Sequence, residues 1–380
     1  MPMTRQAMKS EFSQRGVAAV VFLAIFAVIM LGVLTTALGG RSVQNEYDAK
    51  TFPVLAAAKD ALIAYAAAHP NVPGRLPCAD IDNDGEEDCA VAGDQLGRLP
   101  WKTLGIAPLR DASGECLWYA VSATFRESPL FTPINSDKDG QFSIMTDTTT
   151  TIASGVIAVV IAPGPPLNAA DRSPSPTPPF HCGGNVTATN YLDTLDATHT
   201  NAGIGPNFIA GVPSDTFNDR LVYITPSEFF PRVEKRVAAE IKKALQDYHA
   251  ATGTYPFAND FTPPYDCTPS TLRGLLPGLA CAAPLNWLPS WLVADQWNTI
   301  TYYAVDPASA ITVQNTPVPN NNKEVVIVMA GRKIAPLQTA RPCVVITDCL
   351  EGPVNTSGTN TFESKPASPA FNDIVVVVAP

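Results

Sequence analysis

An uncharged apolar segment near the N-terminus constrains this chain more than any other feature. Val17–Leu38 contains 22 residues without Asp, Glu, Lys or Arg. As a helix it would be about 33 Å long, enough to cross a hydrocarbon core of about 30 Å. A secretory signal has a shorter apolar region and a small-residue cleavage site, for which only the LTTA before Leu38 is available. The segment predicts a retained membrane span, with cleavage after Ala37 as the alternative.

The residues that flank the apolar segment predict its orientation. The leader, residues 1–16, carries Arg5, Lys9 and Arg15 against one acid, Glu11. An excess of basic residues keeps that side of a span in the cytoplasm. Everything after the span is therefore expected outside the cytoplasm.

Composition agrees with export. Charged residues make up 16% of the chain, below the usual share of about 25%, and 36 of the 380 residues are proline. The cysteine count, 8, is even and fits an oxidising compartment. The net charge, 25 − 35 = −10, opposes binding to phosphate backbones, so no nucleic-acid partner is expected.

The chain repeats itself. The clearest pair is FNDRLVYIT from Phe217 and FNDIVVVVA from Phe371. The same order links KDALIAYAAA with KKALQDYHAA, GRLP with GTYP, LPW with LPSW, LWYAV with TYYAV, and GVIAVVIAPG with KEVVIVMAGR. We interpret these pairs as an internal duplication.

Each copy predicts one helix and several strands. Apolar residues in the second copy recur at helical spacing, at Val233, Val237, Ile241, Leu245 and Tyr248. The apolar runs GVIAVVIAPG and NDIVVVVAP are short and β-branched, which favours buried strands. The predicted fold class is α+β, with a helix packed on an antiparallel sheet in each of two tandem modules.

The repeat also predicts the module boundaries. The first module covers residues 47–225 and the second 228–380, after a transmembrane or assembly helix at 17–46. The junction is TPSEFFP at residues 225–231, where Ser227 is expected to cap the following helix. The proline-rich segment 163–179 is interpreted as a loop inside the first module, because the second copy has a loop in the same place.

The loop CADIDNDGEEDC, from Cys78 to Cys89, has the clearest local chemistry. Five of its residues fit positions 1, 3, 5, 6 and 9 of a calcium-binding loop: Asp80, Asp82, Asp84, Gly85 and Asp88. The twelfth position is Val91 instead of glutamate, so a bound Ca²⁺ would lack one usual ligand. A solvated acidic turn is the alternative. NSDKDG, from Asn135, has a similar opening without later acids and is interpreted as a turn.

The cysteines fall four in each predicted module. Four cysteines allow three pairings in each module. Closeness in sequence favours Cys78 with Cys89, Cys267 with Cys281, and Cys343 with Cys349, which leaves Cys116 for Cys182. A zinc site is the alternative, but no pair has the two-residue spacing of zinc ligands.

The sequence gives little support for an enzyme. It has no phosphate-binding loop, dinucleotide fingerprint or nucleophile elbow. Its four histidines, His69, His181, His199 and His249, have no partner at metal spacing and are expected on the surface. We therefore expect a protein without catalytic activity.

A basic leader ending in Gly16, an apolar helix that continues into the first module, and a helix on a sheet together resemble the type IV pilins and the pseudopilins of type II secretion. The strings GRLP, LPW, WYAV and FND are similar to those of pilin-like proteins. The resemblance implies that a prepilin peptidase in the inner membrane cleaves between Gly16 and Val17 and methylates the new N-terminus. It also implies that other pilin or pseudopilin subunits are the partners.

One position departs from the family. Major pilins have glutamate at the fifth mature position, where this chain has Val21, and no acid occurs between Val17 and Leu38. A buried carboxylate without a partner is costly, so a subunit without a neighbour above it gains nothing from one. The resemblance therefore favours a minor subunit at or near the tip of a pilus or pseudopilus. The alternative is a single-span, membrane-anchored periplasmic binding protein or adhesin.

Overall fold

A computed structural model gives the fold of most of the chain after the apolar segment. It describes residues 44–90, 92–127, 132–167, 170–174, 182–261, 272–278, 287–315, 320–336, 338 and 340–379. The predicted cleavage site at Gly16 and Val17, the apolar segment, Val91 and the predicted Cys267–Cys281 pair lie outside these residues. The chain divides into two compact units, residues 1–53 and 54–380.

The first described helix, Gln44–Ala68, is long and apolar enough to cross a membrane by length and composition. Core helices of soluble domains share this property. Four side chains at helical spacing, Leu55, Ala58, Leu62 and Ala66, have no exposed surface and belong to the main hydrophobic core. From Val54 onward this helix is therefore part of the second compact unit.

The first sheet has four antiparallel strands in the order β1-β2-β5-β9. Its strands are β1 (Gln95–Arg98), β2 (Trp118–Val121), β5 (Ala158–Ala162) and β9 (Arg220–Ile224). Tyr119 and Val121 join the core that contains the helix, whereas Trp118 and Ala120 join a second core on the other face. Because both faces of the sheet are covered, β5 consists only of apolar residues, all fully buried.

A smaller sheet covers the second face. Its order is β4-β3-β8, with β3 (Phe142–Met145), β4 (Thr151–Val156) and β8 (Asn207–Ile209). β3 pairs with β8 in parallel, an arrangement that the expectation of antiparallel sheets did not include. A 3-10 turn (Ala188–Asn190) and the short pair β6 (Thr194–Asp196) and β7 (His199–Thr200) lie between β5 and β8 in the sequence.

Helix α2, Pro226–Thr252, begins directly after β9. The expectation that Ser227 caps this helix is wrong, because Thr225 is the residue before the first turn and its N–H donates to Glu228 Oε2 at 3.4 Å. Threonine followed three residues later by glutamate is a capping-box sequence. The segment predicted as a junction, residues 225–231, is therefore mostly helical. Gly253, with φ 80°, ends the helix in the left-handed conformation.

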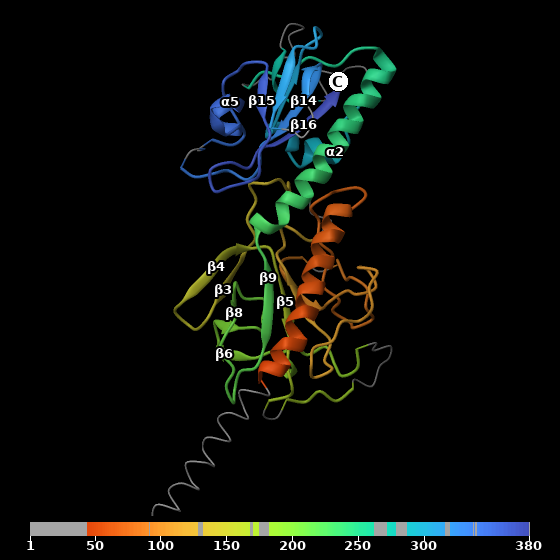
Figure 1. Cartoon of the computed structure of the whole chain (residues 1–380). Helices are drawn as coiled ribbons and strands as arrows, with labels where there is room; N and C mark the ends of the chain where they lie inside the picture. The colour runs from red at the N-terminus through yellow and green to blue at the C-terminus, as the bar shows by residue number, and fades with distance from the viewer. Residues whose placement is uncertain are drawn as a thin grey trace, which may run out of the picture. The chain divides into compact units, whose positions relative to one another are not determined.

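The second sheet has the order β10-β11-β14-β16. Its antiparallel strands are β10 (Arg273–Leu275), β11 (Thr301–Val305), β14 (Val325–Met329) and β16 (Ile374–Ala379). Figure 1 shows α2 alongside β14 and β16, and it contacts both. A small sheet, β13-β12-β15, again contains a parallel pair; its strands are β12 (Ile311–Gln314), β13 (Asn320–Lys323) and β15 (Thr361–Glu363). Short helices lie in the same part of the chain: α3 (Ser290–Ala294), η3 (Trp297–Thr299), α4 (Ile346–Cys349) and α5 (Gly352–Asn355). Below, the first half of the compact unit means residues 54–225 and the second half residues 226–380.

The matched sequence strings occupy the same places in the two sheets. LWYAV and TYYAV contain β2 and β11, and the two FND strings lead into the edge strands β9 and β16. Both sheets follow one order, and each has a small sheet with a parallel pair. The loop 163–179 connects β5 to later strands of the same half, as the repeat predicts. The module boundaries remain predictions, since residues 54–380 form one compact unit.

Candidate metal site and polar junctions

The acidic loop, residues 80–88, lies between the first described helix and β1. A disulfide between Cys78 and Cys89 closes it, with the two Cα atoms 5.3 Å apart. Asp80 is 1% exposed, and its main chain exchanges two hydrogen bonds with Arg98, the last residue of β1. The first candidate ligand is therefore fixed to the first sheet.

Hydrogen bonds inside the loop fold it around Asp80. Its Oδ1 accepts the N–H of Asn83 at 2.6 Å, and its Oδ2 accepts the N–H of Gly85 at 2.9 Å. Gly85 has φ 90°, and a Cβ there would lie 2.6 Å from the ring of Trp101. Only glycine fits both the backbone conformation and the space.

Three of the four predicted ligands come together. Carboxylate oxygens of Asp80, Asp82 and Asp88 lie within 4.8 Å of one another. Asp84 is not in this group; its Oδ1 accepts the N–H of Glu86 at 2.7 Å. Burial, with a smaller contribution from the charges of Asp84 and Asp82, raises the pKa of Asp80 to about 6, although the hydrogen bonds from Gly85 and Asn83 oppose the rise. Oxygen ligands of this kind suit hard cations such as Ca²⁺, which would offset the mutual repulsion of the carboxylates.

Calcium is expected to stabilise the protein through this loop. A ligand that binds only the folded state stabilises it by mass action, about 2.7 kcal/mol at a hundred times the dissociation constant. Millimolar Ca²⁺ should therefore raise the melting temperature by a few degrees over a sample with chelator, and the gain should disappear in Asp82→Asn/Asp88→Asn.

Asp215→Asn is the control, because Asp215 is exposed and lies outside the loop. It should keep the calcium response. Equal melting temperatures with calcium and with chelator would identify the loop as a solvated acidic turn.

A second polar region joins the two halves of the compact unit. The junction loop, residues 132–140, contains the NSDKDG string, for which the sequence predicts a simple turn. Asp295, which has no exposed surface, accepts the N–H of Ile134 at 2.9 Å and lies 3.4 Å from an Arg75 guanidinium nitrogen. Burial raises the pKa of Asp295 despite these partners. The junction loop therefore forms an interface, which its sequence did not reveal.

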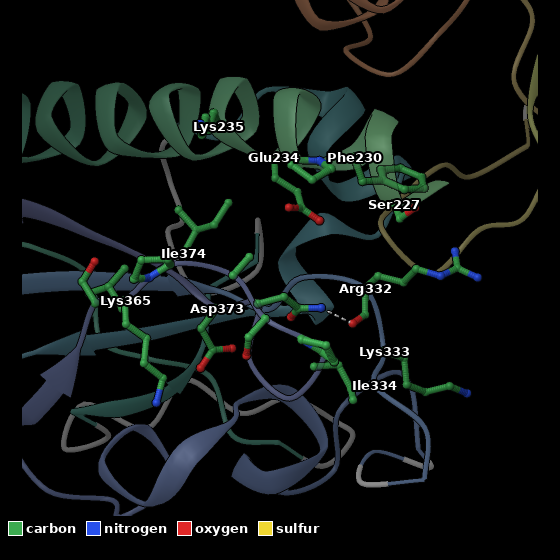
Figure 2. A pocket seen from close by; sticks show the side chains of 18 of the residues that line it. Ser227, Phe230, Glu234, Lys235, Arg332, Lys333, Ile334, Lys365, Asp373 and Ile374 are labelled. Atoms are coloured by element: carbon green, nitrogen blue, oxygen red, sulfur yellow. Dashed lines mark hydrogen bonds between the residues drawn. The ribbon is translucent and has the colours of Figure 1, made fainter. Parts of the chain in front are cut away.

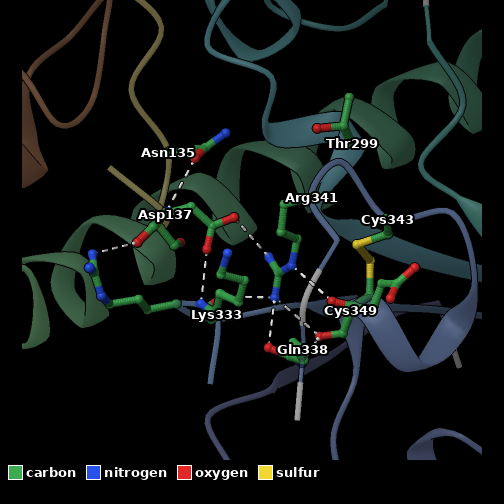
Figure 3. Close-up of polar contacts among 12 residues, drawn as sticks. Asn135, Asp137, Thr299, Lys333, Gln338, Arg341, Cys343 and Cys349 are labelled. Carbon is green, nitrogen blue, oxygen red and sulfur yellow. Dashed lines mark hydrogen bonds and ion pairs between the residues drawn. A yellow bond between two sulfur atoms is a disulfide. The ribbon is translucent and has the colours of Figure 1, made fainter. Parts of the chain in front are cut away.

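The same loop contacts the segment that follows β14 (Figure 3). Asp137 Oδ1 accepts the N–H of Lys333 at 2.9 Å, and its Oδ2 lies 3.3 Å from Arg341. Arg332 donates to the carbonyl of Lys138 at 3.1 Å and pairs with Asp139. These contacts hold the first half of the unit to the second.

Helix α2 contributes a buried carboxyl to this interface. Glu234 is 3% exposed, and Ser136 donates to its Oε1 at 2.6 Å. Burial raises the pKa of Glu234 to about 7; Asp137 and Glu351 add to this rise and Arg341 opposes it. This group therefore changes charge near neutral pH.

Each FND string ends in a buried acid with an acidic neighbour. In the first half, Asp219 Oδ2 accepts the N–H of Asp193 at 2.8 Å and the side-chain amide of Asn201 at 2.9 Å. Asp193 Oδ2 in turn accepts the N–H of Asn218 at 2.6 Å. Burial, followed by the charge of Asp193, raises the pKa of Asp219 well above its usual range.

The second half repeats this arrangement. Asp373 Oδ2 accepts the N–H of Glu351 at 3.0 Å and the side-chain amide of Asn355 at 2.8 Å. Glu351 Oε2 accepts the N–H of Asn372 at 2.9 Å. The pKa of Asp373 is likewise raised, first by burial and then by Glu351. The FND repeat could have indicated these acids, but their partners come from loops without detectable similarity.

The described cysteines pair as their spacing favours. Besides Cys78–Cys89, disulfides join Cys116 to Cys182 and Cys343 to Cys349. The three linkages span 11, 66 and 6 residues of sequence separation, respectively.

Two histidines have acidic partners instead of lying free on the surface. The His69 side chain is 10% exposed, and its Nε2 lies 2.7 Å from Glu127. His199 Nδ1 lies 2.8 Å from Asp196, and the ring of His249 stacks on Tyr255. The hydroxyl of Thr198 lies 3.0 Å from His199 Nδ1. Neither cluster of possible metal ligands among the described residues contains a histidine.

Comparison with known proteins found no similarity. No protein-family model, no curated protein and no solved structure matches the chain.

Proposed function

We propose that this protein is a non-enzymatic, minor subunit of a pilin-like filament, anchored in the inner membrane with its two halves in the periplasm. The observation that carries the proposal is the placement of helix Gln44–Ala68. It follows the apolar segment within a few residues and buries its later turns in the core beside a four-stranded antiparallel sheet. Such a chain presents a folded head on the end of an apolar helix that can pack in lipid and then against other helices.

The second half supports a position at or near the tip. It has a four-stranded sheet of the same order as that of the first half, and α2 continues from β9 without a linker. The proposal takes this as a head of two modules. In the shaft of a filament, where subunits pack side by side, every subunit would have to accommodate a head of this size. Val21 in place of an acid agrees with a subunit that needs no partner above it. Other pilin or pseudopilin subunits would then be its partners in a type IV pilus or a type II secretion pseudopilus.

Gly16→Val tests the proposal. In the unchanged protein, mass spectrometry of the processed chain should find Val17, methylated, at the N-terminus. The variant should keep its full leader and fail to enter filaments, because the peptidase requires a small residue before the cleaved bond.

Gly39→Val is the control, since Gly39 lies beyond the apolar segment. It should be processed normally. An N-terminus at Met1 in the unchanged protein would favour the anchored binding protein or adhesin, for which the cleft described below is the supporting feature. An N-terminus after Ala37 would mean that the span is removed, which contradicts both readings.

A further inference from the structure

Strand β16 forms one edge of the second sheet, so one side of its main chain has no neighbouring strand in that sheet. It is an edge strand, and its six residues, IVVVVA, include no charge, no proline and no glycine. Ile374, Val375, Val376 and Val377 are only half-buried. Edge strands are usually protected by charged side chains, proline or bulges, because their free main-chain groups pair readily with another chain.

Helix α2 protects only the later part of this strand. Lys242 Nζ donates to the carbonyl of Val377 at 2.9 Å, and Gln246 Nε2 donates to that of Val378 at 3.1 Å. Among the described residues, no side chain makes a hydrogen bond to the main chain of Ile374 or Val375. Both residues, in the first part of the strand, are registered with β14, so the main-chain groups available for pairing here are those that point away from β14.

A cleft of about 590 Å³ opens beside that part of the strand. Three segments line it: the first turns of α2, residues 332–334, and residues 364–375 (Figure 2). Phe230, Ile334 and Ile374 supply apolar surface. A cleft of this size accommodates the side chains of an extended peptide.

The rim of the cleft is basic although the chain as a whole is acidic. Lys235 and Lys333 are exposed on two sides of it. Neither amine has an ion-pair partner within the described part of the chain. Lys365, on a third side, pairs with Glu363 and lies over the ring of Phe371.

Acids at the base of the cleft oppose an anionic ligand only weakly. Glu234 and Asp373 line the cleft but are 3% and 5% exposed. Burial raises the pKa of both carboxyls, so they carry little charge in mildly acidic solution. The exposed lysines therefore dominate the electrostatic potential at the opening of the cleft.

The equivalent place in the first half lacks this combination. A cleft of about 420 Å³ beside β9 contains Lys59, but this amine lies 2.8 Å from Glu228, which lines the same cleft. β9 also begins with Arg220, a charge that β16 lacks. Of these two clefts, the one beside β16 thus combines an open edge with cations that have no ion-pair partner among the described residues.

We propose that the cleft beside β16 binds an extended acidic segment of a partner polypeptide, which adds a strand to the open part of β16. The main chain of the segment pairs with those main-chain groups of Ile374 and Val375 that do not face β14, while its carboxylates contact Lys235 and Lys333. Strand addition of this kind takes affinity from main-chain hydrogen bonds and specificity from alternate side chains. The inference does not depend on the filament proposal.

Fluorescence anisotropy with the full chain in detergent micelles tests the inference. The probe is a labelled short peptide that alternates valine and glutamate. It should bind, and Lys235→Glu/Lys333→Glu should weaken binding about tenfold, because two attractive contacts become repulsive and 1.4 kcal/mol corresponds to a factor of ten.

The matched control is Arg236→Glu/Lys243→Glu, which makes the same change in net charge on α2 outside the cleft. It should leave binding unchanged. Thermal melts should show that both double variants remain folded.

Two further probes decide the mode of binding. A peptide that alternates valine and lysine should not bind, and methylation of alternate main-chain nitrogens of the acidic peptide should abolish binding. The proposal fails if the acidic peptide does not bind, if both double variants bind it equally, or if the methylated peptide binds as well as the original.

Discussion

Replacing Cys116 and Cys182 with alanine should lower the free energy of unfolding by about 4 kcal/mol. A disulfide lowers the entropy of the unfolded chain by an amount that grows with the logarithm of the number of residues in the loop that it closes. This disulfide has a sequence separation of 66 and links the residue before Leu117 and β2 to the segment that follows the proline-rich loop. Both cysteines are buried. Urea denaturation followed by circular dichroism measures the change.

The other two described disulfides are internal controls. Separations of 11 for Cys78–Cys89 and 6 for Cys343–Cys349 give smaller expected losses of about 3 and 2 kcal/mol. The three alanine pairs should follow this order in the presence of a chelator, which removes any contribution of a metal at the acidic loop. Equal losses for all three would show that loop entropy does not determine their contribution.

The sheets could be predicted because their signal is local and repeated. Runs such as AVVIA and VVIVM contain apolar residues on both faces, which predicts strands covered on both sides, and β5 and β14 are such strands. The duplication indicated that the two sheets are equivalent, since three of the matched pairs contain or lead into strands at the same places in the two sheets. Spacing was also sufficient to pair the described cysteines.

The small sheets were not predicted, because their strands carry little signal of their own. β8 and β15 have three residues each, and each forms its parallel pair with a strand far away in the sequence. Register between such short strands depends on the packing of Phe208 and Phe362 into the cores. Nothing in the local sequence indicates that packing.

The candidate site was only partly predictable for a similar reason. Asp80, Asp82 and Asp88 lie in one short loop, so their spacing in the sequence predicts that their carboxylates lie close together. The structure brings these carboxylates together. The junction loop has an equally acidic opening, yet Asp137 and Asp139 pair with Arg341 and Arg332. Whether an acid binds a cation or an arginine depends on contacts across about 200 residues, which a turn pattern does not contain.

Replacing both Asp219 and Asp373 with asparagine should make the protein more stable at pH 8 and weaken its dependence on pH. Burial raises the pKa of each carboxyl well above its usual 3.8, so the folded state holds these protons when the unfolded state has lost them. The stability that each group contributes is complete below pH 4 and decreases as the pH rises towards the folded-state pKa. The loss reaches at most about 1.4 kcal/mol per pH unit for each group.

Asparagine should fit both places. Oδ2 of each aspartate accepts the two hydrogen bonds that the structure gives it, and an amide oxygen can accept the same two. Oδ1 of each is buried without a hydrogen-bond partner. An amide nitrogen at this position should cost about as much free energy as the protonated oxygen of the acid does. The substitution therefore removes the ionisation and keeps the contacts. The two effects should be additive, because the sites share no partner.

Unfolding free energies from urea titrations at pH 5, 6, 7 and 8 provide the measurement. The unchanged protein should lose stability across this range, and the double variant should lose less. The remaining slope is due to other buried acids with raised pKa values, chiefly Glu234, at about 7, and Asp80, at about 6. Asp147→Asn is the control, since Asp147 is exposed and hydrogen bonds from Thr149 and Thr150 lower its pKa to about 2. Its ionisation stabilises the fold above pH 4 and is lost only as the pH falls towards 2, so this variant should leave the slope between pH 5 and 8 unchanged. A double variant with the full slope of the unchanged protein would show that both acids are ionised in the folded state, with their charges balanced by the surrounding N–H groups.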